Sequence, residues 1–215
     1  VYSWGGEKVS DDRRASNNNE LKYSLRSVAK FVPWVNRIFI LINPPKKVPS
    51  WFNERYGELI TLVDETETFP KGSPLPNKNS NAIETTIHNI PGLSEHFIYS
   101  CDDFFIGRPV SYREFFTEDG KALIPKKILL ETDMEVGKSN LDIKFPKTVV
   151  GHYPHIPIPL RKSAILEYQK EYSDYIDWVR SFQTREGIGC NVCDGLICPC
   201  QQQHYPISIF MYKKG

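Results

Sequence analysis

The sequence centres on Phe97-Ile98-Tyr99-Ser100-Cys101-Asp102-Asp103-Phe104-Phe105. The apolar run from Phe97 to Tyr99 predicts a short buried strand, and two adjacent aspartates follow it closely. Like charges a few ångströms apart resist joint ionisation, and a divalent cation removes that cost. Carboxylate oxygens shared with substrate phosphates are common ligands of Mg²⁺ and Mn²⁺. We therefore expect Asp102 and Asp103 to hold Mg²⁺ or Mn²⁺ at a strand end, although aspartates also commonly cap helices and form turns.

Strand and helix patterns alternate on the amino-terminal side of these aspartates. The predicted strands are residues 1–4, 37–42, 59–63 and 97–99, and the predicted helices are residues 20–31, 51–56 and 81–90. Asn17, Asn18 and Asn19 are good N-cap candidates for the first helix, and Pro33 ends it. This alternation predicts an α/β fold with a parallel, Rossmann-like sheet. Ligands of such sheets bind beyond the carboxyl ends of the strands, where Asp102 and Asp103 are expected.

The patterns are weaker after Pro109. Residues 123–125 and 127–130 indicate one or two further strands, whereas residues 131–148 show no clear pattern. Three prolines between His152 and Leu160 predict a stiff extended loop, because proline removes backbone donors and fixes φ. Apolar residues recur at helical spacing from about residue 161 to residue 182.

The composition is that of an ordinary globular protein. The 215 residues can form one sizeable domain, and the formal net charge of +1 gives no indication of a nucleic-acid partner. No stretch approaches the roughly 20 apolar residues that a membrane-spanning helix requires. The chain begins at Val1, inside a predicted strand, so we expect a trimmed piece of a longer protein and assign no localisation from a leader.

Several polar side chains are candidates for catalysis. His155 can act as a base or stabilise a phosphate, with two neighbouring prolines holding its backbone, and His152 competes for that role. Arg180 can neutralise phosphate charge with its planar guanidinium. Glu84 lies four residues before His88, which puts both on one face of a helix. The alternatives are structural, since loop histidines often serve the fold and helical arginines and glutamates are usually solvated.

Four cysteines lie within eleven positions near the carboxyl end: Cys190, Cys193, Cys198 and Cys200. They either bind one structural Zn²⁺ or form two disulfides, and zinc is favoured because C-x-x-C is a common metal-binding motif. Four thiolates leave no open position for water, so such a zinc would not be catalytic. Zinc favours a cytoplasmic protein, and disulfides favour a secretory lumen. We expect residues 186–215 to form a small cysteine-rich segment packed on a catalytic domain of residues 1–185.

These motifs resemble the Stealth family of sugar-phosphate transferases. The resemblance rests on Asn18-Asn19-Glu20-Leu21-Lys22-Tyr23-Ser24-Leu25-Arg26-Ser27-Val28, on Ala82-Ile83-Glu84 and on the stretch around Asp102-Asp103, with weaker similarity at Val1-Tyr2-Ser3-Trp4 and at 155–160. It implies a GT-A-like fold that binds a nucleotide sugar, with Asp102 and Asp103 near metal and diphosphate. It also implies catalytic roles for Asp103, His155, Arg180 and Glu84. Substrate contacts are expected from Tyr2, Trp4, Asn18, Glu20, Arg26, Asn81 and His152.

Two departures from the family pattern affect the expected reaction. The family's fourth block has no counterpart in this sequence, and Asn17 stands where the family has an aspartate. From the missing block we expect a glycosyltransferase that moves a sugar from a UDP-sugar donor to a hydroxyl of a carbohydrate acceptor. The first alternative is transfer of a hexose 1-phosphate to a glycan. The second is an inactive carbohydrate-binding adaptor, because a fold does not guarantee a function.

Overall fold

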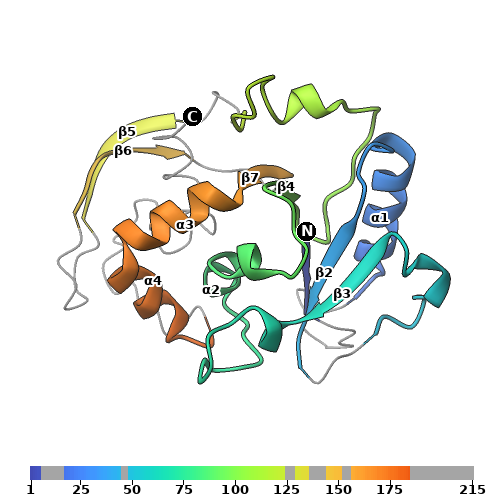
Figure 1. Ribbon diagram of the computed structural model, residues 1–215, viewed down its shortest axis with the longest axis horizontal. Helices are drawn as coiled ribbons and strands as arrows, with labels where there is room; N and C mark the ends of the chain where they lie inside the picture. Colours follow the sequence, from blue (N-terminus) through green and yellow to red (C-terminus); the bar gives the residue numbers. More distant parts are fainter. Residues whose placement is uncertain (6–16, 45–47, 124–128, 136–143, 152–155, 185–215) are drawn as a thin grey trace.

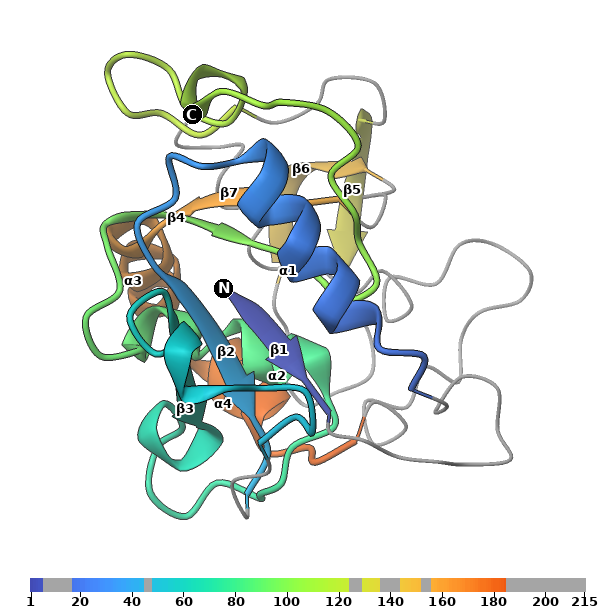
Figure 2. The ribbon, with the colours of Figure 1, turned by 90° about the vertical axis from the view of Figure 1, so that its right-hand side faces the viewer.

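Figures 1 and 2 show the computed structural model, which describes residues 1–5, 17–44, 48–123, 129–135, 144–151 and 156–184. Three parallel strands, β1 (Tyr2–Trp4), β2 (Ile38–Ile42) and β3 (Ile60–Asp64), form a sheet in that order. Tyr2 pairs with Ile40, and Ile40 with Leu62. The structure therefore confirms the predicted parallel α/β arrangement for these three strands.

A fourth strand, β4 (His96–Tyr99), lies on the other side of β1. Ser100, just beyond it, forms a parallel bridge with Tyr2, and its backbone N–H donates to the carbonyl of Val1 at 2.9 Å. β4 also pairs with β7 (Ile158–Arg161), and this pairing is antiparallel. The sheet is thus mixed rather than wholly parallel.

β7 corrects the prediction that residues 152–160 lack regular structure. Its Pro159 pairs with Ile98, and the backbone N–H of Lys162 donates to the carbonyl of Glu95 at 2.9 Å. Hydrogen-bonded and non-hydrogen-bonded pairs alternate along an antiparallel ladder, so Pro159 occupies a non-hydrogen-bonded position. The ladder does not need the N–H that proline lacks.

Helices cover both faces of the sheet (Figure 2). On one face α1 (Glu20–Phe31) buries Leu21 and Leu25 against side chains of β1 and β2, such as Trp4 and Ile40. The other face carries Phe39, Leu41 and Val63, which pack in the largest core cluster. That cluster includes residues of α2 (Ser80–Glu84), α3 (Lys162–Glu171) and α4 (Ser173–Arg180). Burial of these apolar side chains on both faces is the main stabilising term of the fold.

Two predicted helices are interrupted. The helix expected at residues 81–90 ends at Glu84, and a separate 3₁₀ turn, η3, covers Ile87–Asn89. The hydroxyls of Thr85 and Thr86 donate to the carbonyls of Ala82 and Ile83, and threonine side chains that bind nearby backbone compete with helix continuation. The helix expected at residues 161–182 is divided into α3 and α4 at Tyr172, which has φ −123° and ψ 40°.

The remaining elements are short or peripheral. The 3₁₀ turns are η1 (Glu54–Tyr56), η2 (Glu65–Glu67) and η4 (Tyr112–Glu114), so the helix expected at residues 51–56 is a single turn. β5 (Leu129–Glu135) and β6 (Lys144–Gly151) form an antiparallel pair (Figure 1). The strand predicted at residues 127–130 overlaps only the beginning of β5. Among the described residues, no helix is both long enough and apolar enough to span a membrane.

Candidate functional site

Three carboxylates gather at the carboxyl edge of the sheet. Asp102 and Asp103 form the turn that follows β4, and Glu20 begins α1. The pKa of Asp102 is raised to about 6, chiefly by burial, then by the negative charge of Asp103 and, to a smaller extent, by that of Glu20. The structure therefore brings the predicted pair together with Glu20, with Asp102 half-buried and Asp103 exposed.

Two serines of α1 hold the segment that follows the aspartates. Ser24 is fully buried, its hydroxyl lies 3.0 Å from the Tyr2 hydroxyl, and it donates to the carbonyl of Phe104. The Ser27 hydroxyl accepts a hydrogen bond from the backbone N–H of Ile106 at 2.9 Å. We call these two residues the serine clamp. The sequence analysis did not single them out, and the available signal was two serines at i and i+3 inside a helix, where serine is a weak helix former.

Two buried tyrosines connect the aspartates to α2. The Tyr99 hydroxyl lies 3.1 Å from the Ser3 hydroxyl, and burial, followed by the negative charge of Glu84, raises the pKa of Tyr99 well above its ordinary value. Burial also raises the pKa of Tyr2, with a smaller contribution from the charge of Asp102. Glu84 and Asp102 therefore both act on this layer of hydroxyl groups, which the sequence did not predict.

The α2 helix carries two predicted site residues on one face. Glu84 is buried, with 2% of its surface exposed. The side-chain oxygen of Asn81, three residues earlier, is also buried and has no hydrogen-bond partner among the residues that the structure describes. Asn79 caps this helix, because its side chain accepts a hydrogen bond from the backbone N–H of Asn81 at 3.1 Å.

Arg180 binds the end of α2 directly. Its Nε donates to the Thr85 hydroxyl at 2.8 Å, and its Nη2 donates to the Thr85 carbonyl at 2.7 Å. In return, the side-chain amide of Asn79 donates to the carbonyl of Val179 in α4 at 3.3 Å. Arg180 of α4 thus binds the end of α2, and Asn79 at the start of α2 binds a carbonyl near the end of α4. Arg180 therefore lies beside the residue that follows Glu84.

The other predicted contact residues have varied environments. Asn18 donates to both carboxylate oxygens of Glu20, at 2.8 and 2.9 Å. The Arg26 guanidinium lies over the exposed Tyr23 ring, 5.5 Å from its centroid. Tyr2 and Trp4 are buried in the core beneath α1, so their rings pack rather than face solvent. Their roles in substrate binding remain predictions.

Two predicted groups lie outside the described residues: His152 with His155, and the four cysteines Cys190, Cys193, Cys198 and Cys200. Their roles in catalysis and in zinc or disulfide formation remain predictions. His88, in contrast, is buried, and burial followed by the positive charges of Arg180 and Lys162 lowers its pKa to about 4. It is a neutral core side chain at physiological pH.

The chemistry of the aspartate pair fits a divalent cation. Asp102 and Asp103 offer hard oxygen ligands, and both burial and the neighbouring carboxylates raise the pKa of Asp102, a cost that a bound cation would offset. Mg²⁺ often takes only one or two carboxylates and completes its shell with water and substrate phosphates. Within the described ranges, no group of three or more His, Cys, Asp and Glu side chains is placed to hold a metal. Substrate oxygens and water could complete the shell of a metal held by the pair.

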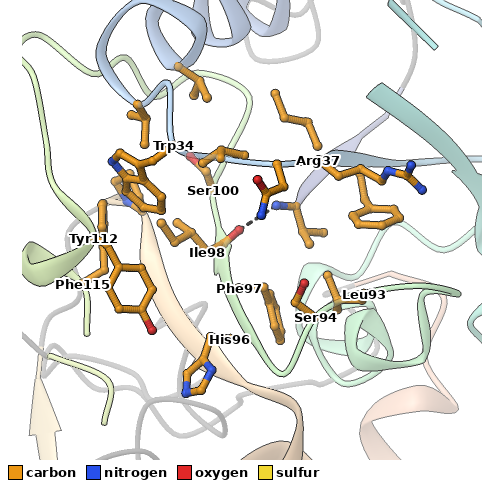
Figure 3. Close-up of a pocket in the computed structure, with 18 of the residues that line it drawn as sticks. Trp34, Arg37, Leu93, Ser94, His96, Phe97, Ile98, Ser100, Tyr112 and Phe115 are labelled. Atoms are coloured by element: carbon orange, nitrogen blue, oxygen red, sulfur yellow. Dashed lines mark hydrogen bonds between the residues drawn. The ribbon is translucent and has the colours of Figure 1, made fainter. Parts of the chain in front are cut away.

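Figure 3 shows a pocket of about 510 Å³ beside β2 and β4. It is lined by residues at the amino ends of β2 and β4, including Arg37, His96 and Phe97, and by the aromatic rings of Trp34, Tyr112 and Phe115. Neither Asp102 nor Asp103 lines it. Ser100 and Ile106, on either side of the aspartate turn, do line it, so the pocket extends toward the carboxylate edge.

Comparison with known proteins identifies the family. The profile described as Stealth protein CR2, conserved region 2, matches residues 14–124, which is more than half of the chain. The chain belongs to the Stealth family. The Stealth region matched contains α1, the serine clamp, Glu84, Asp102 and Asp103, and thus most of the described carboxylate edge.

Curated relatives of this Stealth chain are named exopolysaccharide phosphotransferases. CpsY of Mycobacterium leprae is 35% identical over 204 residues, which cover 89% of this chain and 37% of the relative. CpsY of Mycobacterium tuberculosis is 37% identical over 182 residues, which cover 79% of this chain and 34% of the relative. A Nocardia farcinica protein is 34% identical over 209 residues, covering 89% and 40%. The family assignment and these transferase names confirm the predicted resemblance.

The same comparisons change the preferred reaction. The chain spans between about a third and two fifths of the length of these relatives. The absence of the fourth block from this sequence therefore carries no information about the bond that is broken. The names of the relatives agree better with sugar-phosphate transfer, which was the first alternative, than with glycosyl transfer.

Proposed function

We propose that the protein transfers a sugar 1-phosphate from a nucleotide sugar, such as a UDP-sugar, to a hydroxyl group of a glycan. The observation that carries this proposal is the meeting of Asp102, Asp103 and Glu20 at the carboxyl edge of a parallel sheet, inside a Stealth region. This edge is where α/β sheets bind nucleotide ligands. The names of the relatives support transfer of a phosphorylated group.

The proposed reaction breaks the diphosphate of the donor. An acceptor oxygen forms a bond to the phosphorus atom next to the sugar, and the bond from that phosphorus to the bridging oxygen breaks. The nucleoside monophosphate leaves with the bridging oxygen, and the acceptor proton passes to a base. His155 is the candidate base, because imidazole titrates near neutral pH.

The described residues have distinct proposed roles. Asp102 and Asp103 would hold Mg²⁺ or Mn²⁺, which when bound would neutralise charge on the diphosphate. Glu20 and Asn18 form a preformed polar pair beside them. The side-chain oxygen of Asn81, which has no partner in the described part of the chain, can accept a hydrogen bond from a hydroxyl of the nucleotide sugar, and Glu84 lies one helical turn further along. Arg180 supports this helix through Thr85.

A product assay tests the proposal directly. The protein is incubated with UDP-glucose, UDP-galactose or UDP-N-acetylglucosamine, with Mg²⁺ or Mn²⁺ and a mixture of oligosaccharide acceptors. The released nucleotide is then identified by chromatography. UMP is the expected product. UDP in its place would restore glycosyl transfer as the preferred reaction, and no acceptor-dependent release with any donor would favour the carbohydrate-binding adaptor.

A further inference from the structure

An exposed aromatic ring stands two residues beyond the aspartate pair. Phe105 has 48% of its surface exposed, whereas its neighbours Phe104 and Ile106 are partly buried. Successive side chains of an extended segment point to opposite sides, and burial alternates in the same way here, with Phe105 exposed between two partly buried neighbours. An extended chain advances about 3.3 Å per residue, which puts Phe105 about 7 Å along the chain from Asp103.

The backbone around Phe105 is fastened at several points. The serine clamp holds the carbonyl of Phe104 and the N–H of Ile106, the residues on either side of Phe105. Further along, the N–H of Val110 donates to the carbonyl of Phe31 at 3.1 Å, and the indole N–H of Trp34 donates to the carbonyl of Val110 at 2.7 Å. The segment therefore runs beside α1 from its first half to its end (Figure 2).

Exposure alone would say little, because single exposed apolar side chains are normal on protein surfaces. Phe105 differs in that side-chain hydrogen bonds from a packed helix hold the backbone on both sides of it, two residues from Asp103. An aromatic side chain on a fixed backbone has only two rotatable bonds, so it loses little conformational freedom when a ligand covers it. These properties are those of a binding platform beside a reactive site.

We propose that Phe105 is the platform on which the glycan acceptor packs, with one C–H face of a pyranose ring against the aromatic face. Such a face is apolar while the sugar hydroxyls stay in water, and an aromatic ring has a negative face that attracts C–H groups. One or two sugar residues span the distance from Phe105 to Asp103, so the acceptor hydroxyl can reach the donor. The assignment of the bound glycan as the acceptor rests on the proposed function. Binding of the glycan to Phe105 does not require turnover.

The test measures carbohydrate binding without a reaction. Saturation-transfer NMR is recorded with mannotriose, maltotriose and cellotriose as probes, for the unsubstituted chain and for Phe105→Ala, Phe105→Leu and Phe105→Tyr. We expect at least one trisaccharide to bind, with affinity reduced about three- to tenfold by Phe105→Ala and retained by Phe105→Tyr. Phe105→Leu should bind more weakly than Phe105→Tyr, because leucine is apolar but has no aromatic face.

A matched control separates stacking from a general loss of surface apolarity. Tyr56 also has 48% of its surface exposed, but it lies in η1, before β3 and at the opposite edge of the sheet. Tyr56→Ala should leave binding unchanged, and thermal unfolding should show that both alanine variants keep the fold. The inference is overturned if no trisaccharide binds the unsubstituted chain, or if Phe105→Ala binds as well as Tyr56→Ala. Failure of sugar-phosphate transfer with binding intact would instead overturn the proposed function alone.

Discussion

The guanidinium of Arg180 donates two hydrogen bonds to Thr85, one to the hydroxyl at 2.8 Å and one to the carbonyl at 2.7 Å. The two residues are 95 positions apart in the sequence. Their contact joins the end of α4 to the residue that follows Glu84, and the side chain of Gln169 donates to the same carbonyl. The position of Glu84 thus depends on helices from the far end of the described chain.

Replacing Arg180 with Met is expected to lower the free energy of unfolding by about 2 kcal/mol, since both hydrogen bonds are lost from a largely buried side chain, 13% exposed. Urea denaturation followed by circular dichroism measures the change. Arg113→Met is the control, because Arg113 pairs with Glu118 on the surface with 77% of its side chain exposed, and such pairs contribute little. Equal denaturation midpoints for the two variants would contradict a structural role for the Arg180 contact.

His88 is expected to make the protein less stable as the pH falls. Its pKa is lowered from 6.5 to about 4, so the unfolded chain binds a proton on this residue between these values and the folded chain does not. The neutral state of His88 therefore contributes about 3 kcal/mol to the free energy of unfolding. This contribution is complete above pH 6.5 and is lost as the pH falls to about 4. The neighbouring charges that act on it are Arg180 and Lys162.

Urea denaturation between pH 4.5 and 7.5 tests the His88 prediction. The variant His88→Gln does not titrate, so its free energy of unfolding should depend less steeply on pH than that of the unsubstituted chain. Any loss of packing lowers the variant's curve at every pH and leaves its slope unaffected. Parallel curves for the two proteins would show that His88 is protonated equally in both states.

Glu65 is expected to make the protein less stable as the pH rises, which is the opposite of the dependence expected from His88. It is buried, the N–H of Asn77 donates to its Oε2 at 3.0 Å, and its pKa is raised to about 7, chiefly by burial. The folded state therefore favours the protonated acid, and this contribution is lost as the pH rises from about 4.5 through about 7. Glu65→Gln keeps an acceptor without a charge, so it should raise the free energy of unfolding at pH 8 by about 3 kcal/mol relative to its effect at pH 4.5.

The Glu65 measurement uses Glu58→Gln as its control, because Glu58 is an exposed glutamate just before β3. Glu58→Gln should shift stability by less than about 0.5 kcal/mol at either pH. If Glu65→Gln behaved in the same way, the pKa of Glu65 would be the same in the folded and unfolded states.

Asp103→Asn is expected to abolish metal-dependent release of UMP and to leave the fold intact, since Asp103 is exposed and its replacement is nearly isosteric. Binding of Mn²⁺, measured by electron paramagnetic resonance with UDP present, should weaken at least about tenfold, because one carboxylate ligand is lost. Asp119→Asn, in the exposed turn after Phe116, is the control and should bind Mn²⁺ normally. Full activity of Asp103→Asn would remove the pair from the site.

The local patterns of the sequence were sufficient for the central sheet. Continuous apolar runs predicted β1, β2, β3 and β4 within one or two residues, because burial on both faces demands such runs wherever they occur. The same patterns put Asp102 and Asp103 after a strand, and the family motifs around them were recognisable without a structure. Helix ends were predicted less well, since the hydrogen bonds of the Thr85 and Thr86 side chains, rather than apolar spacing, end α2.

By itself, then, the sequence determined the family, the α/β class and the identity of the acidic pair, because each of these depends on residues close together in the chain. Only the tertiary structure decided that Ser24 holds the carbonyl of Phe104, 80 positions away, and that Arg180 supports the helix of Glu84. The exposure of Phe105 and the position of Pro159 within β7 were likewise evident only from the tertiary structure. These features depend on which distant backbone atoms meet when the core closes, and no local pattern of side chains specifies that meeting.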